Sequence, residues 1–314
     1  MKVVIAGGSG HVGSSLIRHL VTMGHSIVVI SRTKSTLPNS KVVNWDGKSL
    51  GDWTEVLNGS DVIINLAGRS VNCRYTSKNL AEMMDSRINS TKIIGKAISQ
   101  SKNPPKVWLQ ASTATIYCHR VDAANDEISG IIGGNEPKAP FKWNASVEIA
   151  KAWELALEEA STPDTRKVAL RSALTLSPDK GSVFDVFAHL ARLGIGGKLG
   201  SGKQFVSWIH EDDFANALMF NVDNAQISGA VNICSPNPLP ESKFMSILGK
   251  SVRAKFAFNF PSWMVEIGTR AIGTESELIL KSRRAVPTRL LESGFQFKFP
   301  NWVDASNDLA SKLI

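Results

Sequence analysis

The chain has 314 residues, 43% of them hydrophobic, and its 36 basic and 28 acidic residues give a formal net charge of +8. This length and composition are typical of a globular protein with a large core, so we expect one compact unit with a cap. The chain has no apolar run near the ~18 residues of a membrane-spanning helix, and its apolar start turns into glycines before a signal peptide could form, which excludes a membrane partner and predicts a cytoplasmic protein.

Strands and helices alternate through the first 176 residues. Short apolar runs predict strands at 2–6, 27–30, 62–66, 107–111 and 167–176. Helical spacing of apolar residues predicts helices at 12–23, 53–57, 77–100 and 147–160. This alternation predicts an α/β fold, a Rossmann-type doubly wound parallel sheet.

The order of elements loosens after residue 177. A helix is expected near 182–193, a glycine-rich loop at 194–202, and strands at 205–209 and 230–234. We therefore divide the chain into a Rossmann core, residues 1–176, to which 205–235 returns, and a smaller substrate or cap region made of 177–204 and 236–314.

A glycine-rich turn stands between the first predicted strand and the first helix. It reads Gly7-Gly8-Ser9-Gly10-His11-Val12-Gly13 and satisfies both GxxGxxG and GxGxxG. Glycines permit a tight turn, and the helix N-terminus then directs free N–H groups at a pyrophosphate. We predict dinucleotide binding here, the alternative being a turn without a ligand. The expected contacts are Gly7, Ser9, Gly10, His11, Val12 and Gly13.

The end of the second strand predicts which dinucleotide is bound. A carboxylate there would accept hydrogen bonds from the ribose of NAD, but Ser31-Arg32-Thr33-Lys34 contains none. Arg32, assisted by Ser31 or Lys34, matches a 2′-phosphate, so we predict NADP(H) as the cofactor. The alternative is that Arg32 is a solvated loop cation.

Several segments resemble the extended short-chain dehydrogenase/reductase superfamily, and most closely its atypical, SDR39U-type epimerase-like branch of predicted nucleoside-diphosphate-sugar epimerases. They are the glycine turn, Asn65-Leu66-Ala67-Gly68, Asp85-Ser86-Arg87, Leu199-Gly200-Ser201-Gly202, Ser207-Trp208-Ile209-His210-Glu211-Asp212-Asp213 and Leu290-Leu291-Glu292-Ser293-Gly294-Phe295. The resemblance spans nearly the whole chain. It implies a Rossmann-type core, a nicotinamide cofactor and a small C-terminal domain.

The resemblance also implies roles for individual residues. Asp46 would face the adenine, and Leu66, Ala67, Gly68 and Arg87 would border the cofactor. Ser112 and Thr113 follow the fifth strand, where the superfamily places the hydroxyl that hydrogen-bonds the reacting carbonyl or alcohol. Both are kept as catalytic candidates.

One departure from the superfamily concerns its acid/base pair, a Tyr followed four residues later by a Lys. Tyr75 and Tyr117 are the two tyrosines, and neither has that lysine. By alignment the two positions fall on Ser146 and Ala150. Tyr117 is a third catalytic candidate if it faces the pocket, and otherwise a packing residue.

The segment at 207–213 predicts a strand that delivers Trp208 and His210 toward an interdomain cleft, where they would contact the substrate. The alternative for His210 is a satisfied core residue. The acids that follow favour a helix start, because negative charge in a first turn complements the helix dipole.

Other groups predict no further ligands. The basic residues are scattered, which favours a phosphate-bearing ligand over nucleic acid. The cysteines and histidines lack zinc spacing, so no metal is predicted. Two functions remain: an NADP(H)-dependent epimerase or oxidoreductase acting on a small carbonyl, alcohol or nucleotide sugar, or a non-enzymatic NADP(H) sensor. A monomer or a homodimer is expected.

Overall fold

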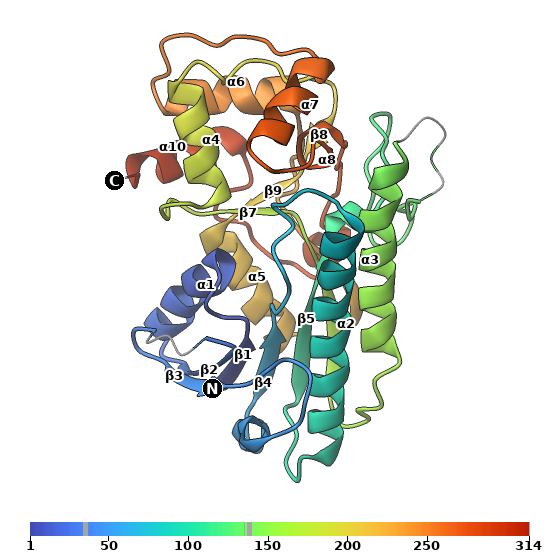
Figure 1. Cartoon of the computed structure of the whole chain (residues 1–314). Coiled ribbons are helices and arrows are strands. Elements are labelled where there is room, and N and C mark those ends of the chain that lie inside the picture. Colours follow the sequence, from blue (N-terminus) through green and yellow to red (C-terminus); the bar gives the residue numbers. More distant parts are fainter. Residues whose placement is uncertain (34–36, 135, 137–139, 314) are drawn as a thin grey trace.

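The computed structural model describes residues 1–33, 37–134, 136 and 140–313. These residues contain a seven-stranded parallel sheet in the order β10-β6-β5-β4-β1-β2-β3 (Figure 1). Its strands are β1 (Lys2–Ala6), β2 (Ser26–Ser31), β3 (Lys41–Asn44), β4 (Val62–Asn65), β5 (Val107–Thr113), β6 (Arg166–Ser172) and β10 (Gly229–Ile233). The strand order reverses beside β1, which confirms the predicted doubly wound fold.

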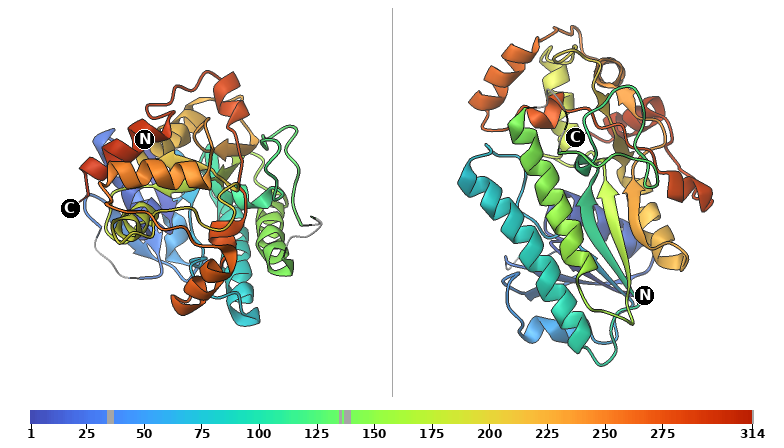
Figure 2. Two further views of the ribbon diagram at one scale, coloured as in Figure 1. Left: turned by 90° about the horizontal axis from the view of Figure 1, so that it is seen from above. Right: turned by 90° about the vertical axis from the view of Figure 1, so that its right-hand side faces the viewer.

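Helices cover both faces of this sheet. Side chains alternate along β1, so Val3 and Ile5 pack on one face while Val4 and Ala6 pack on the other. The first face is covered by α1 (His11–Thr22) and α5 (Glu211–Asp223), and the second by α2 (Ser77–Gln100) and α3 (Phe141–Glu158). Figure 2 shows α2 and α3 side by side along the sheet. Both faces are therefore buried, as a parallel sheet requires.

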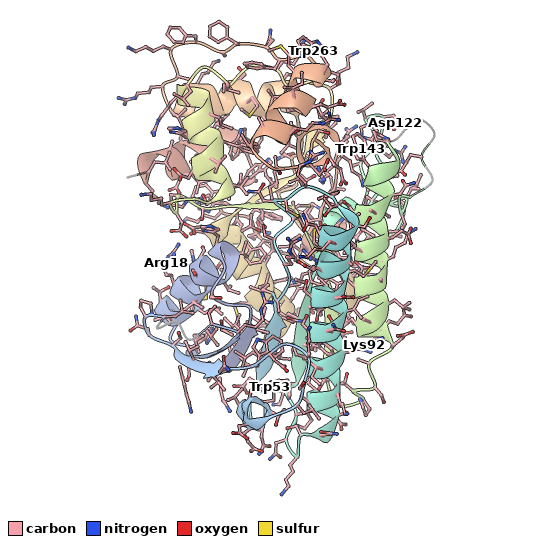
Figure 3. All side chains as sticks on the ribbon, viewed as in Figure 1. Arg18, Trp53, Lys92, Asp122, Trp143 and Trp263 are labelled. Carbon is pink, nitrogen blue, oxygen red and sulfur yellow. The ribbon has the colours of Figure 1, made fainter. Side chains whose placement is uncertain are left out.

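A smaller layer caps the carboxyl end of the sheet. Its core gathers Phe184, Trp208, Phe244 and Trp302. The helices of this layer are α4 (Val183–Arg192), α6 (Glu241–Ser251), α7 (Ser262–Ala271), α8 (Glu277–Leu280) and α10 (Trp302–Ser311). The short helix α9 (Thr288–Glu292) packs instead on β10 of the main sheet. Trp263 lies at the outer end of the cap in Figure 3. No helix in the described ranges is both long and apolar enough to cross a bilayer.

Three expectations about the elements need correction. The strand expected at 167–176 is divided into β6 and β7 (Leu174–Leu176), and only β6 joins the main sheet. Of the segment 205–235, only β10 joins the main sheet, because β9 (Trp208–His210) pairs with β7 (Leu174–Leu176) and β8 (Phe205–Val206) pairs with β11 (Leu239–Pro240). Helix α3 begins at Phe141, after Pro140, and not at residue 147. The earlier start adds the six residues 141–146 to this helix, about 1.7 turns.

Candidate functional site

The turn between β1 and α1 closes so tightly that two of its positions admit only glycine. Gly7 has φ +75°, and a Cβ there would lie 2.8 Å from the backbone of Ala67. A Cβ at Gly13 would lie 2.6 Å from the backbone of Gly8. Both distances are too short for a side chain, so these glycines let α1 begin directly at the sheet edge.

The N-terminus of α1 is open toward a ligand. Its N-cap, Gly10, offers no side chain to the first-turn N–H groups, and that turn contains no acidic residue. A Cβ built at Gly10 would meet only the Gly7 carbonyl oxygen, at 3.8 Å, so the space before the helix is free. Uncapped N–H groups and the positive end of the helix dipole fit a pyrophosphate.

A cavity of about 570 Å³, called here the dinucleotide cavity, lies in front of this helix end. Its lining includes nine of the predicted cofactor residues: Gly7, Ser9, Gly10, Ser31, Arg32, Asp46, Leu66, Ala67 and Gly68. The other four do not line it. His11 is exposed, Gly13 packs beneath the turn, and Val12 and Arg87 border a neighbouring cavity.

One end of the dinucleotide cavity is rich in cations and hydroxyls. Arg32 and Lys48 are exposed side chains on its wall, beside the buried hydroxyl of Ser31. The Ser31 Oγ lies 3.2 Å from the Thr33 Oγ1. Lys34 lies outside the described residues. This end therefore has the charge that a 2′-phosphate would require.

Asp46 is the predicted adenine contact. Its carboxylate accepts the backbone N–H groups of Ser49 and Lys48, each at 2.8 Å, and these bonds lower its pKa to about 2. The Asp46 side chain is exposed, and its two hydrogen bonds close the turn that follows β3.

A second cavity of about 340 Å³, called here the hydroxyl cavity, lies at the carboxyl ends of β5 and β6. Leu66 lines both cavities, so they adjoin. The candidates Ser112 and Thr113 line the hydroxyl cavity. So do Ser146 and Ala150, the positions where the superfamily has its Tyr and Lys. The structure therefore brings the predicted hydroxyls to the place where that pair would lie.

The two predicted hydroxyls have different partners. Ser112 Oγ donates to Glu154 Oε1 at 2.5 Å, and Glu154 is held by two bonds from the Arg171 guanidinium, at 2.9 and 2.8 Å. Thr113 Oγ1 instead accepts the backbone N–H of Thr115 at 3.1 Å, which leaves the Thr113 proton for another acceptor. Thr113 is therefore better placed than Ser112 to donate to a carbonyl oxygen.

The structure removes Tyr117 from the catalytic candidates. The residue is 2% exposed and does not line the hydroxyl cavity. Its hydroxyl donates to Asn232 Oδ1 at 2.9 Å and accepts from Arg171 Nη1 at 3.0 Å. Burial raises the pKa of this phenol. Tyr117 is a hydrogen-bonded core residue because the chain turns inward after β5.

Trp208 and His210 also lie away from the cavities, so the expectation that they reach a cleft is wrong. Both are fully buried, and Trp208 packs on Trp302 with ring centroids 5.0 Å apart. His210 Nδ1 accepts the Asp212 backbone N–H at 3.0 Å, and its Nε2 lies 2.9 Å from Asp308 Oδ2. Pairing of β9 with β7 buries both side chains against the cap. They are scaffold residues.

Sequence reasoning did not select two side chains of the hydroxyl cavity, Tyr75 and Arg283. Tyr75 precedes α2 and Arg283 follows α8, so neither lies near a motif of the superfamily. Arg87, expected at the cofactor, also borders this cavity, with its guanidinium 4.9 Å from the Trp153 ring centroid. Burial lowers the pKa of Arg87 to about 10.

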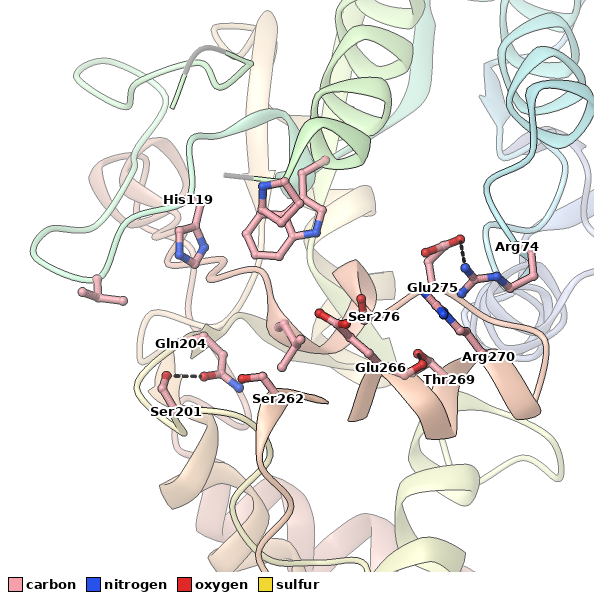
Figure 4. Close-up of a pocket in the computed structure, with 14 residues that line it drawn as sticks. Arg74, His119, Ser201, Gln204, Ser262, Glu266, Thr269, Arg270, Glu275 and Ser276 are labelled. Carbon is pink, nitrogen blue, oxygen red and sulfur yellow. Dashed lines mark hydrogen bonds and ion pairs between the residues drawn. The ribbon is translucent and has the colours of Figure 1, made fainter. Parts of the chain in front are cut away.

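A third cavity, of about 400 Å³, lies between the start of α3 and the helices α7 and α8 (Figure 4). His119 lines one side of it, and Arg74 and Arg270 line the other. Trp143 also lines it, with its ring centroid 5.0 Å from that of His119. Arg74 pairs with Glu275 at 3.0 Å. The segment around α8 borders both this cavity and the hydroxyl cavity, so it forms a wall between the two.

Comparisons with known proteins show which family and fold this chain resembles. A family model described as the NAD dependent epimerase/dehydratase family matches residues 3–234, and a domain of unknown function, DUF1731, matches residues 254–309. The epimerase family protein YfhF of Bacillus subtilis is 30% identical over 301 residues, covering 95% of this chain and 94% of its own.

Two solved structures are similar over nearly all of this chain. The human epimerase family protein SDR39U1, crystallised with NADPH, superposes with a TM-score of 0.85 at 26% identity, and the match covers 99% of this chain and 100% of that one. A nucleoside-diphosphate sugar epimerase from Corynebacterium glutamicum has a TM-score of 0.75 at 26% identity, covering 99% of this chain and 58% of its own.

Proposed function

Since the chain belongs to the NAD-dependent epimerase/dehydratase family, we propose that it binds NADP(H) and transfers hydride between the nicotinamide and a carbonyl or alcohol group of a small molecule. One observation carries this proposal: the dinucleotide cavity and the hydroxyl cavity adjoin at Leu66. The first presents the uncapped N-terminus of α1, and the second presents the hydroxyl of Thr113.

The cofactor would lie along the dinucleotide cavity and supply the hydride. The N–H groups of α1 would bind its pyrophosphate, and Arg32, Lys48 and Ser31 would bind a 2′-phosphate by charge-assisted hydrogen bonds. That set favours NADP(H) over NAD(H), in agreement with the NADPH found in the structure of human SDR39U1.

The hydroxyl cavity would hold the reacting group of the substrate. Thr113 would donate to its oxygen, and Ser112, fixed by Glu154, would shape the wall beside it. The third cavity, with Trp143 and the cations Arg74 and Arg270, could receive the rest of a nucleotide sugar. A small carbonyl or alcohol compound would need the hydroxyl cavity alone.

A second function, NADP(H) sensing without catalysis, is favoured by the replacement of the usual acid/base pair by Ser146 and Ala150. A single experiment separates the two functions. Small molecules that copurify with the protein are identified by mass spectrometry and are then incubated with the protein and NADPH deuterated at nicotinamide C4. Deuterium in the product supports catalysis. Binding of NADPH with no transfer to any copurifying compound supports a sensor.

Calorimetric titration with NADPH and NADH tests the cofactor. We expect NADPH to bind at least about tenfold more tightly, a difference of roughly 1.4 kcal/mol. Equal affinities would contradict the assignment of the 2′-phosphate to Arg32, and the absence of binding by either cofactor would overturn the proposed function.

A further inference from the structure

Tyr75 is a phenol in the cavity where the superfamily's tyrosine is missing. It is 8% exposed and lines the hydroxyl cavity together with Thr113 and Ser146. It reaches this place from the segment before α2, whereas the missing tyrosine would come from α3. Its backbone N–H donates to Glu275 Oε1 at 2.9 Å, which fixes this segment to the cap.

A hydroxyl and a fixed cation lie in the same wall as this phenol. Ser146 Oγ donates to Glu277 Oε2 at 2.5 Å. The other oxygen of Glu277 lies 3.7 Å from Arg283 Nη2 and 3.6 Å from Lys281 Nζ, and the Glu277 side chain is 1% exposed. Arg283 Nε donates to Thr115 Oγ1 at 2.9 Å, so the guanidinium is held at the edge of the cavity.

The surroundings keep this phenol protonated at neutral pH. Burial raises the pKa of Tyr75 to about 12, and the charge of Glu277 acts in the same direction. The charge of Arg283 acts in the opposite direction, because a nearby cation favours the phenolate. Tyr75 is thus a proton donor that is neutral at neutral pH, with the Arg283 cation near its phenolate.

Resting on the proposed function, we propose that Tyr75 is the proton donor of the hydride transfer, with Ser146 and Arg283 as its positioning residues. In the reducing direction the carbonyl carbon receives hydride from NADPH, which becomes NADP⁺, and the carbonyl π electrons move to the oxygen. That oxygen takes the Tyr75 proton and becomes an alcohol. The phenolate recovers a proton from water. The oxidising direction reverses each transfer.

Packing offers a competing role for Tyr75, because its ring lies in a small cluster with Met83 and Ile149. A spectroscopic test distinguishes the two roles without a known substrate. The chain has two tyrosines, so 3-fluorotyrosine labelling gives two ¹⁹F signals, which Tyr75→Phe and Tyr117→Phe assign. Fluorination also lowers the phenol pKa toward the pH range that the fold tolerates. The labelled protein is titrated alone, with NADPH and with NADP⁺.

We expect the positive charge of oxidised nicotinamide to lower the Tyr75 midpoint by about half a pH unit or more relative to the NADPH complex. Tyr117, which lies outside the cavity, should not change and serves as the matched control. Arg283→Leu should raise the Tyr75 midpoint in every state, because the cation favours the phenolate. Calorimetry on Tyr75→Phe should show NADPH affinity within about twofold of the wild type.

Two results would overturn the inference, and they are distinguishable. Equal Tyr75 midpoints with NADPH and NADP⁺, when calorimetry shows that both bind, would place the phenol away from the reacting atoms and leave the proposed function standing. Failure of both cofactors to bind would remove the proposed function and this inference with it.

Discussion

The dinucleotide cavity and the hydroxyl cavity adjoin, but they are built in different ways. In the first, the N-terminus of α1 is opened by two continuous segments, the glycine turn and residues 66–68, and the phosphate end is formed by side chains that follow β2 and β3. The second is formed by side chains such as Tyr75, Ser146 and Arg283, and the first and last of these are more than 200 residues apart in the sequence. The comparison indicates that cofactor binding depends on short continuous segments of the core, while the catalytic chemistry depends on how the cap packs against the core.

The largest effect is expected from a side chain in the glycine turn. Gly7→Ala should lower the free energy of unfolding by about 2 to 5 kcal/mol, because left-handed backbone strain adds to a clash with Ala67. NADPH affinity should fall on the order of 100-fold as the start of α1 shifts. Gly24→Ala is the matched control: φ is +79° but the space around it is open, so about 1 to 2 kcal/mol is expected. Urea unfolding and calorimetry measure both variants, and equal losses would show that the clash is unimportant.

In the hydroxyl cavity, removal of the two candidate hydroxyls, Ser112 and Thr113, should reduce activity by different amounts. Thr113→Val should reduce NADPH-dependent reduction of an aromatic aldehyde probe by about 100-fold, the usual cost of a lost donor to a developing oxyanion. Ser112→Ala should cost less, since the Ser112 proton is already donated to Glu154. NADPH affinity should remain within about twofold in both variants. A larger loss in Ser112→Ala than in Thr113→Val would reverse the assignment.

A smaller effect is expected at the phosphate end of the dinucleotide cavity. Arg32→Ala should reduce the preference for NADPH over NADH by about tenfold, because one charge-assisted partner of the 2′-phosphate is lost. Calorimetry with both cofactors measures the ratio. Unchanged NADPH binding would make Arg32 a solvated cation.

The smallest effect concerns one of the polar contacts between α1 and α5. His19 Nε2 lies 2.6 Å from Asp212 Oδ1, and this hydrogen bond raises the pKa of His19 above 6.5. A raised folded pKa gives stability that is fully present below pH 6.5 and is lost as pH rises through the folded value. The free energies of unfolding of wild type and His19→Gln, measured in urea from below pH 6.5 to above the folded pKa of His19, should differ by under about 1 kcal/mol. The difference should be largest at low pH. A difference that grows with pH would contradict the sign.

The sequence predicted the dinucleotide cavity better than the hydroxyl cavity, for a physical reason. The glycine turn and Ser31-Arg32 are local patterns, and a parallel sheet brings the carboxyl ends of its strands to one edge. Ser112 and Thr113 were found through the resemblance to the superfamily, which places a hydroxyl after the fifth strand. Tyr75 and Arg283 have no local pattern, because the fold of the cap brings them to the cavity. Trp208 and His210 were wrongly expected at a cleft, because an apolar strand before a helix has the same sequence pattern whether it borders a cleft or lies in a core.

The crystal structure of the NADPH complex tests the central claim, that the two cavities form one site, most directly. We predict the pyrophosphate at the N-terminus of α1, the 2′-phosphate beside Arg32, and the nicotinamide in the hydroxyl cavity within reach of Thr113 and Tyr75. A nicotinamide that lies outside the hydroxyl cavity, with NADPH bound at the glycine turn, would contradict the claim and leave the protein a binder of the cofactor alone.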